Sequence, residues 1–217
     1  MTYRDVQSVR THDLLEIDAK PFIDCNASAP EWVVKTLQRT PFVVARRGQA
    51  FERRIPVGIR GSDRSQRWAA MCPQQLVKKI LPPPRLLMLS VSKSREDAIP
   101  AFRALNLMKE RWRDLDFFWG PGGSVGFELA TGSDVVKAES DLDIIVYAPR
   151  QVPRDMAKVL YAQTLNLAAA VDVRVEAPLC GFSLKEYAWS GPRELLLRKP
   201  TGIALGTDPW VNHDSNQ

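Results

Sequence analysis

Short hydrophobic runs separated by prolines and glycines divide the first third of the chain into small elements. The segment Pro30–Arg39 opens with a proline followed by an acidic residue, a pattern that predicts a helix. The apolar runs Pro41–Ala45 and Ile55–Ile59 enclose a polar stretch containing Gly48, so we expect a β-hairpin there. Pro56 lies within the second run, which predicts that this strand lies at a sheet edge. Together these elements predict a small α+β lobe.

Pro82–Pro84 is the clearest interruption of this pattern. Three successive prolines cannot continue a helix, and they favour an extended spacer. We therefore expect a domain boundary here, with one domain over residues 1–84 and a second over residues 85–217.

Beyond the prolines, apolar residues recur at spacings typical of alternating helices and strands. Residues 96–113 have the three- and four-residue periodicity of a helix, with Pro100 in its first turn, and a second helix is predicted over residues 153–170. A turn over residues 120–124 leads into a further helix. The predicted strands comprise residues 117–119, 141–147 and 171–175. This order predicts an α/β or α+β domain in which helices flank a mixed sheet.

The composition is that of an ordinary globular protein, because 45% of the 217 residues are hydrophobic and 25% are charged. No apolar run approaches the roughly 18 residues that span a bilayer, and the first residues lack the apolar core of a signal peptide. We therefore expect a cytoplasmic protein without a membrane partner. The 3 cysteines are far apart and only 2 histidines are present, which excludes a disulfide framework and a histidine-rich metal site.

Positive charge is concentrated in one short part of the first domain. The net charge of +5 favours an anionic partner. Arginine can bind phosphate through two parallel hydrogen bonds, so Arg60, Arg64 and Arg67, which surround Gly61, are candidate phosphate ligands. A solvated hairpin rim would have the same composition. Since few aromatic residues are interleaved with the arginines, we expect no stable nucleic-acid partner.

Two aspartates and a glycine-rich turn supply the strongest candidate chemistry. Asp141 and Asp143 are two positions apart at the start of an apolar strand, so their side chains are expected on the same face. Such a pair can hold Mg²⁺ (or Mn²⁺), which prefers oxygen ligands and binds together with substrate phosphates. Gly123 and Ser124 lie at the N-terminus of the helix that comes before this strand. They would offer backbone N–H groups and a hydroxyl to those phosphates. The arrangement predicts a metal-dependent phosphoryl- or nucleotidyl-transfer site.

A third carboxylate is expected on the strand that begins at Val171. Alternation places Asp172, Arg174 and Glu176 on one face of this strand and its three valines on the other. Asp172 is the first candidate for the third metal ligand and for a base, and Glu176 is the alternative ligand. Arg174 is a candidate phosphate ligand.

These motifs resemble those of a known family. The Gly-Ser and Asp-x-Asp pairs are similar to those of the DNA polymerase β type of nucleotidyltransferase. More narrowly, the chain resembles the MdcG family, the phosphoribosyl-dephospho-CoA transferases that act as holo-acyl-carrier-protein synthases of malonate decarboxylase. The segments that resemble this family are His12–Leu15, Pro56–Gly61 with Arg64 and Arg67, Gly123–Gly132, Ser140–Asp143 and Asp208–Trp210. They extend over nearly the whole chain.

The resemblance implies an enzyme whose second domain is nucleotidyltransferase-like. It implies transfer of phosphoribosyl-dephospho-CoA from 2'-(5''-triphosphoribosyl)-3'-dephospho-CoA to a serine of the apo acyl-carrier subunit of malonate decarboxylase, with release of diphosphate. Asp141 and Asp143 match the catalytic pair of the family. The basic first domain is then expected to bind the substrate or the carrier.

The residues alone leave two other functions open. Another nucleotidyltransferase, acting on a small molecule, an RNA or a different protein, would share the acidic residues. A non-catalytic RNA- or nucleotide-binding module is favoured only by the positive charge.

Overall fold

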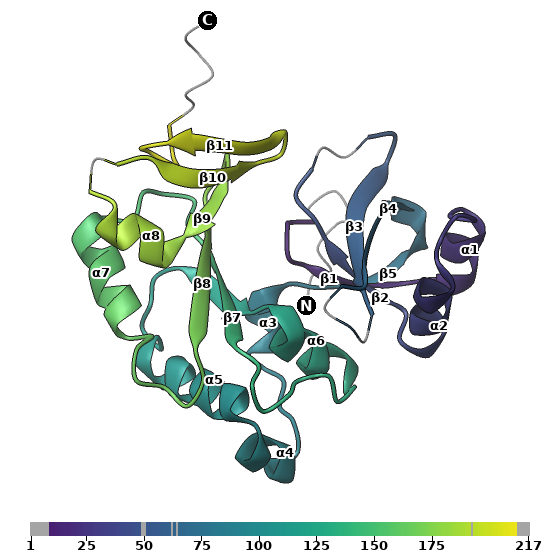
Figure 1. Ribbon diagram of the computed structural model, residues 1–217, viewed down its shortest axis with the longest axis horizontal. Coiled ribbons are helices and arrows are strands. Elements are labelled where there is room, and N and C mark those ends of the chain that lie inside the picture. Colours follow the sequence, from purple (N-terminus) through teal and green to yellow (C-terminus); the bar gives the residue numbers. More distant parts are fainter. Residues whose placement is uncertain (1–8, 49–50, 62, 64, 192, 212–217) are drawn as a thin grey trace, which may run out of the picture. The chain divides into compact units, whose positions relative to one another are not determined.

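Each half of the chain is built on its own β-sheet. The computed structural model describes residues 9–48, 51–61, 63, 65–191 and 193–211 (Figure 1). The chain divides into two units, Met1–Pro83 and Pro84–Gln217. Helices accompany an antiparallel sheet in the first unit and a mixed sheet in the second, so the predicted α+β class is confirmed.

The first unit has a five-stranded antiparallel sheet, whose strand order over the described residues is β4-β3-β2-β1-β5. Its strands are β1 (Leu14–Ile17), β2 (Phe42–Ala45), β3 (Arg54–Arg60), β4 (Arg67–Pro73) and β5 (Val77–Leu81), with the short 3-10 helix η2 (Gln74–Leu76) before β5. Helices α1 (Ala19–Asp24) and α2 (Glu31–Arg39) lie beside each other in Figure 1. Phe22 of α1 and Leu37 of α2 share one buried cluster with Val43 of β2 and Val57 of β3, and this cluster is the core of the unit.

The predicted helix and hairpin of this unit are confirmed, because α2 begins at Glu31 and β2 pairs antiparallel with β3. The prediction that Pro56 lies in an edge strand was wrong. Strand β3 lies between β4 and β2, and Pro56 is paired with Met71 of β4. On its other side, the Pro56 carbonyl accepts a hydrogen bond from the backbone N–H of Arg46, just beyond the end of β2. The proline is tolerated because its missing N–H falls where pairing with β2 ends.

The second unit has a six-stranded mixed sheet, whose strand order over the described residues is β11-β10-β9-β8-β7-β6. Strands β7 and β8 are parallel, and the other neighbouring pairs are antiparallel. The strands are β6 (Phe118–Pro121), β7 (Leu142–Tyr147), β8 (Val171–Glu176), β9 (Gly181–Ser183), β10 (Leu195–Lys199) and β11 (Gly202–Gly206). The helices are α3 (Pro83–Leu86), α4 (Lys93–Ala98), α5 (Pro100–Arg111), α6 (Gly123–Thr131), α7 (Arg154–Ala162) and α8 (Leu184–Trp189).

The central strands of this sheet, β7 and β8, bury apolar side chains. Ile144 and Val146 of β7 are buried, as are Val173 and Val175 of β8. Helices α7 and α8 lie beside each other in Figure 1 and contact one another, while α5 and α6 both contact β7. This packing gives β7 and β8 a fixed position in the unit. Among the described residues, no helix combines the length and the apolar character needed to cross a bilayer.

Three predicted elements of the second half differ from the structure. Residues 82–84 do not form an extended spacer, because Pro83 and Pro84 occupy the first turn of α3, where a proline needs no N–H partner. The predicted helix over 96–113 is divided at Ile99, since the residue before a proline disfavours helical geometry. Pro100 does occupy the first turn of α5, as predicted. The predicted helix over 153–170 ends at Ala162 as α7.

Candidate active site

The site begins where β6 turns into α6. The backbone N–H of Gly122 donates to the carbonyl oxygen of Asp143 at 2.8 Å, which joins this turn to β7. Helix α6 begins at Gly123, earlier than the sequence predicted, and Gly123 has a φ of +53°. A Cβ at Gly123 would lie 1.8 Å from Oδ2 of Asp143. The Asp143 carboxylate therefore lies directly against the first turn of α6, where Ser124 is half-buried, and position 123 has no room for a side chain.

Asp143 and Asp172 are brought together by the parallel pairing of β7 with β8. The register of the two strands places Asp143 beside Asp172, so both side chains are on one face of the sheet. Asp143 is half-buried and Asp172 is exposed. Asp141 is exposed and lies one residue before β7 begins. The two neighbouring strands thus present carboxylates at the end of the sheet where both begin.

Glu176 and Arg174 occupy the same strand as Asp172 but differ in their surroundings. Glu176 is paired with Tyr147, about 13 Å along the strand from the Asp143–Asp172 pair, and it is buried. This separation favours Asp172 over Glu176 as a partner of Asp143. A terminal nitrogen of the Arg174 guanidinium lies 3.5 Å from Oδ2 of Asp172. Contact of Arg174 with a phosphate stays a prediction.

The donor chemistry of this face suits a hard divalent cation. Carboxylate oxygens are the ligands that Mg²⁺ prefers, and substrate phosphates complete its coordination in many sites. In the part of the chain that the structure describes, no three histidine, cysteine, aspartate or glutamate side chains form a group that could hold a metal ion. Metal binding by Asp141, Asp143 and Asp172 therefore stays a prediction.

The predicted phosphate ligands Arg60 and Arg67 lie in the first unit, whereas Arg174 and the carboxylates lie in the second. Arg60, at the end of β3, and Arg67, at the start of β4, are directly opposite each other in the register, and both are exposed. The turn that follows Arg60 is closed by a hydrogen bond from the Gly61 N–H to the carbonyl oxygen of Gln66 at 3.0 Å. Arg64 lies outside the described residues. The structure thus places two like charges side by side on one hairpin.

Models of known protein families match both units of the chain. The model of the phosphoribosyl-dephospho-CoA transferase MdcG C-terminal domain matches residues 87–209, and that of the MdcG N-terminal domain matches residues 10–83. The chain belongs to the MdcG family. The family resemblance found in the motifs is therefore confirmed, and the chain is an enzyme, a transferase.

Relatives from several bacteria are similar over most of their length. The phosphoribosyl-dephospho-CoA transferase of Pseudomonas aeruginosa is 35% identical over 92% of both chains. That of Azotobacter vinelandii is 34% identical over 92% of this chain and 93% of its own. The Klebsiella pneumoniae protein of the same name is 32% identical over 93% of this chain and 96% of its own. No solved structure matches this chain.

Glu128 is a residue of the site region that the sequence analysis did not identify. It lies within α6, its exposed fraction is 2%, and its carboxylate forms an ion pair with Arg95 of α4. Nε and one terminal nitrogen of Arg95 donate to the two carboxylate oxygens, at 2.7 and 3.0 Å respectively. The backbone N–H groups of Val135 and Val136 donate to Oε2 at 2.9 and 2.8 Å. A lone carboxylate within an apolar helix was the only signal in the sequence.

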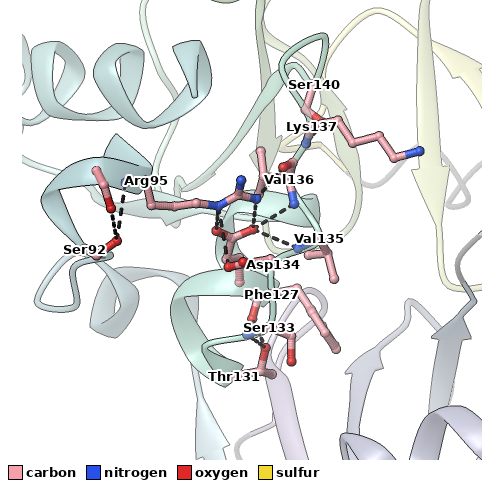
Figure 2. A network of polar contacts seen from close by, with 12 residues as sticks. Ser92, Arg95, Phe127, Thr131, Ser133, Asp134, Val135, Val136, Lys137 and Ser140 are labelled. Carbon is pink, nitrogen blue, oxygen red and sulfur yellow. Dashed lines mark hydrogen bonds and ion pairs between the residues drawn. The ribbon is translucent and has the colours of Figure 1, made fainter. Parts of the chain in front are cut away.

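These contacts hold the connection that leads from α6 to Asp141. Arg95 also donates to the carbonyl oxygen of Val136 at 2.5 Å, so both partners of the ion pair bind the backbone of this segment. The next turn is closed by the Lys137 N–H, which donates to Oγ of Ser140 at 3.0 Å. Figure 2 shows this series of contacts from Arg95 to Ser140, the residue before Asp141.

The ion pair also shifts both pKa values. Burial raises the pKa of Glu128, but the hydrogen bonds and charge of Arg95 and the two backbone N–H groups outweigh it, so the pKa lies below its ordinary value. The hydrogen bond to Glu128 raises the pKa of Arg95. Both groups are therefore charged at neutral pH.

Replacement of Gly123 by alanine tests the contact with Asp143. We expect Gly123→Ala to lower transferase activity by about a hundredfold or more, because its Cβ would displace the Asp143 carboxylate, and such misplacement of a reacting group is costly. The measurement is the initial rate of transfer, together with circular dichroism to verify the fold.

Gly132, at the other end of α6, is the matched control. Its φ is +70°, but a Cβ there would meet nothing within 4 Å. Gly132→Ala therefore introduces similar backbone strain of about 1–2 kcal/mol without a clash, and it should leave activity nearly unchanged. Equal activity losses in the two variants would contradict the role assigned to Gly123.

Glu128→Gln should lower the free energy of unfolding at pH 7 by about 3 kcal/mol, because Arg95 loses its charged partner. The folded-state pKa of Glu128 is depressed, so its stabilisation is fully present above the unfolded-state pKa of about 4.3 and is lost as the pH falls through the folded-state value. The difference in the free energy of unfolding between wild type and variant, measured by urea unfolding, should therefore narrow below about pH 4.3.

Asp155→Asn is the control, because it breaks an exposed pair with Lys158 and should change the free energy of unfolding by less than about 1 kcal/mol. Parallel pH profiles for wild type and Glu128→Gln would contradict this assignment.

Proposed function

We propose that this enzyme transfers phosphoribosyl-dephospho-CoA from 2'-(5''-triphosphoribosyl)-3'-dephospho-CoA to a serine of the apo acyl-carrier subunit of malonate decarboxylase. The observation that carries the proposal is the register of Asp143 beside Asp172, next to the start of α6, in a chain that belongs to the MdcG family. Family membership supplies the group transferred. The paired carboxylates are suited to hold a divalent cation that neutralises phosphate charge, which favours transfer at a phosphate.

The reaction is a displacement at the α-phosphorus of the triphosphate. The serine Oγ forms a new bond to that phosphorus, and the bond to the oxygen that bridges the α- and β-phosphates breaks. Diphosphate leaves with the electron pair, the serine proton passes to a base, and a phosphodiester remains on the carrier. Such a reaction depends mainly on alignment and on neutralisation of charge.

The residues of the second unit divide these tasks. Asp172 is exposed beside Asp143, and it is our candidate base for the serine proton. The N–H groups of the first turn of α6, with the Ser124 hydroxyl, are suited to bind a phosphate oxygen next to Asp143. Mg²⁺, held by Asp141, Asp143 and Asp172, would supply neutralisation of the phosphate charge. Arg174 is close enough to Asp172 to bind the same phosphate.

The first unit is the candidate binding domain for the carrier or for the charged end of the substrate. Arg60 and Arg67 are exposed on one hairpin, where two guanidinium groups would repel each other without an anion between them. Phosphate groups and the carboxylates of an acidic carrier both meet that requirement.

The direct test mixes the purified protein with Mg²⁺, the triphosphoribosyl donor and the apo carrier subunit. We expect the carrier to gain the mass of phosphoribosyl-dephospho-CoA, measured by intact mass spectrometry. Asp143→Asn and Asp141→Ala should each reduce the rate by about a hundredfold or more, since the charge that organises the reaction is removed.

Asp155→Asn, on the exposed surface of α7, is the matched control for these variants and should react at the wild-type rate. No mass gain with a correctly folded apo carrier would refute the proposed acceptor. Normal rates in Asp143→Asn would refute the proposed site.

Removal of divalent metal tests the proposed ion. EDTA should abolish transfer, and excess Mg²⁺ or Mn²⁺ should restore it, because both ions accept carboxylate and phosphate oxygens. Transfer at the full rate in EDTA-treated, metal-free buffer would show that the carboxylates act without an ion.

A further inference from the structure

A cavity of about 490 Å³ lies against Asp172, at the start of β8, where the connection from α7 enters the strand. Its wall is formed by the residues between α7 and β8, together with Tyr161 of α7 and Lys185 of α8. Leucine and alanine residues, including Leu167 and Ala169, contribute to the apolar lining. The volume is within the range of pockets that bind small molecules.

The wall of this cavity is held in place by hydrogen bonds from several elements. The indole N–H of Trp112 donates to Oε1 of Gln163 at 2.8 Å, and Arg111 donates to the carbonyl oxygen of Leu165 at 3.2 Å. The hydroxyl of Thr164 donates to the carbonyl oxygen of Tyr161 at 2.7 Å. At the far end, the N–H of Leu142 donates to the carbonyl oxygen of Ala170 at 2.8 Å. A cavity held at both ends in this way is pre-formed rather than created by the ligand.

We propose that this cavity binds the adenosine part of the donor and that Lys185 pairs with the diphosphate attached to that adenosine. The inference rests on the proposed function, because that function places the reacting α-phosphate beside Asp172. Asp172 also lines the cavity, so whatever occupies the cavity is a direct neighbour of the reacting phosphate.

Covalent connectivity identifies which part of the donor is this neighbour. The α-phosphate is joined through one ribose to the adenosine, whereas the pantetheine arm begins beyond the diphosphate. The cavity adjoining Asp172 is thus reached first by the ribose and the adenine. A tyrosine ring and aliphatic side chains suit the flat face of adenine, and an ammonium group suits a diphosphate.

Two variants change the cavity in different ways. Lys185→Ala removes the cation, and Ala169→Phe fills part of the space. We expect each to raise the KM for the donor roughly tenfold while kcat and the KM for the carrier change less than about twofold, because the affected group binds substrate and does not react. Lys158→Ala is the matched control, since it removes an exposed lysine of α7 that is outside the cavity.

A binding experiment that needs no carrier separates this inference from the proposed function. The probe is 3'-dephospho-CoA, which lacks the triphosphoribosyl group, measured by isothermal titration calorimetry. Wild type and Lys158→Ala should bind it equally, and the two cavity variants should bind it roughly tenfold more weakly. Thermal unfolding of each variant verifies that the fold is retained, and Lys185→Ala, on the surface of α8, keeps the test valid if Ala169→Phe does not fold.

Three results would overturn the inference. One is wild-type protein that does not bind 3'-dephospho-CoA, and another is unchanged binding by folded cavity variants. The third is a raised KM for the carrier alone, which would assign the cavity to the serine-bearing segment of the acceptor. Weakened 3'-dephospho-CoA binding by the cavity variants would support the inference even if the carrier is not modified. In that case, only the proposed acceptor would be refuted.

Discussion

The close approach of the Asp143 carboxylate to the start of α6 is the constraint on which the rest of the site depends. It requires a glycine at position 123, both because of the left-handed backbone and because a Cβ would meet the carboxylate. The Gly122 N–H is bonded to the Asp143 carbonyl, so backbone and side chain of one residue fix the same turn. A negative charge beside the positive end of a helix is favourable, and a phosphate bound there would lie next to the carboxylate.

The buried ion pair of Glu128 with Arg95 controls the other end of α6. It binds the backbone of Val135 and Val136, and the chain continues from there to Asp141. The two interactions therefore fix α6 at its start and fix the segment that follows its end. One fixes the approach of the helix to Asp143, and the other fixes the path of the chain into Asp141. A charged pair of this kind is costly to desolvate, and its four hydrogen bonds to one carboxylate offset that cost.

The candidate active site and the cavity of the second unit have one residue in common. Asp172 is the register neighbour of Asp143 and also part of the wall of the cavity at the start of β8. Because the parallel pairing of β7 with β8 sets this arrangement, a slip of register by one residue would move Asp172 to the other face and separate the carboxylates from the cavity.

Elements whose signals are local could be predicted from the residues alone. The alternation of Val171–Glu176 predicted which face of β8 bears Asp172, and the proline before Glu31 predicted the start of α2. The segments that resemble the MdcG family, spread over nearly the whole chain, were sufficient to identify the family. Contacts between distant segments could not be predicted in this way, because they depend on the packing of the folded chain. Glu128 and Arg95 are 33 residues apart, and the register that separates Glu176 from Asp143 depends on strand pairing across α7. The interior position of Pro56 likewise depended on where β2 stops. Local patterns report propensity and periodicity, whereas these features follow from which segments pack together, and no single segment carries that information.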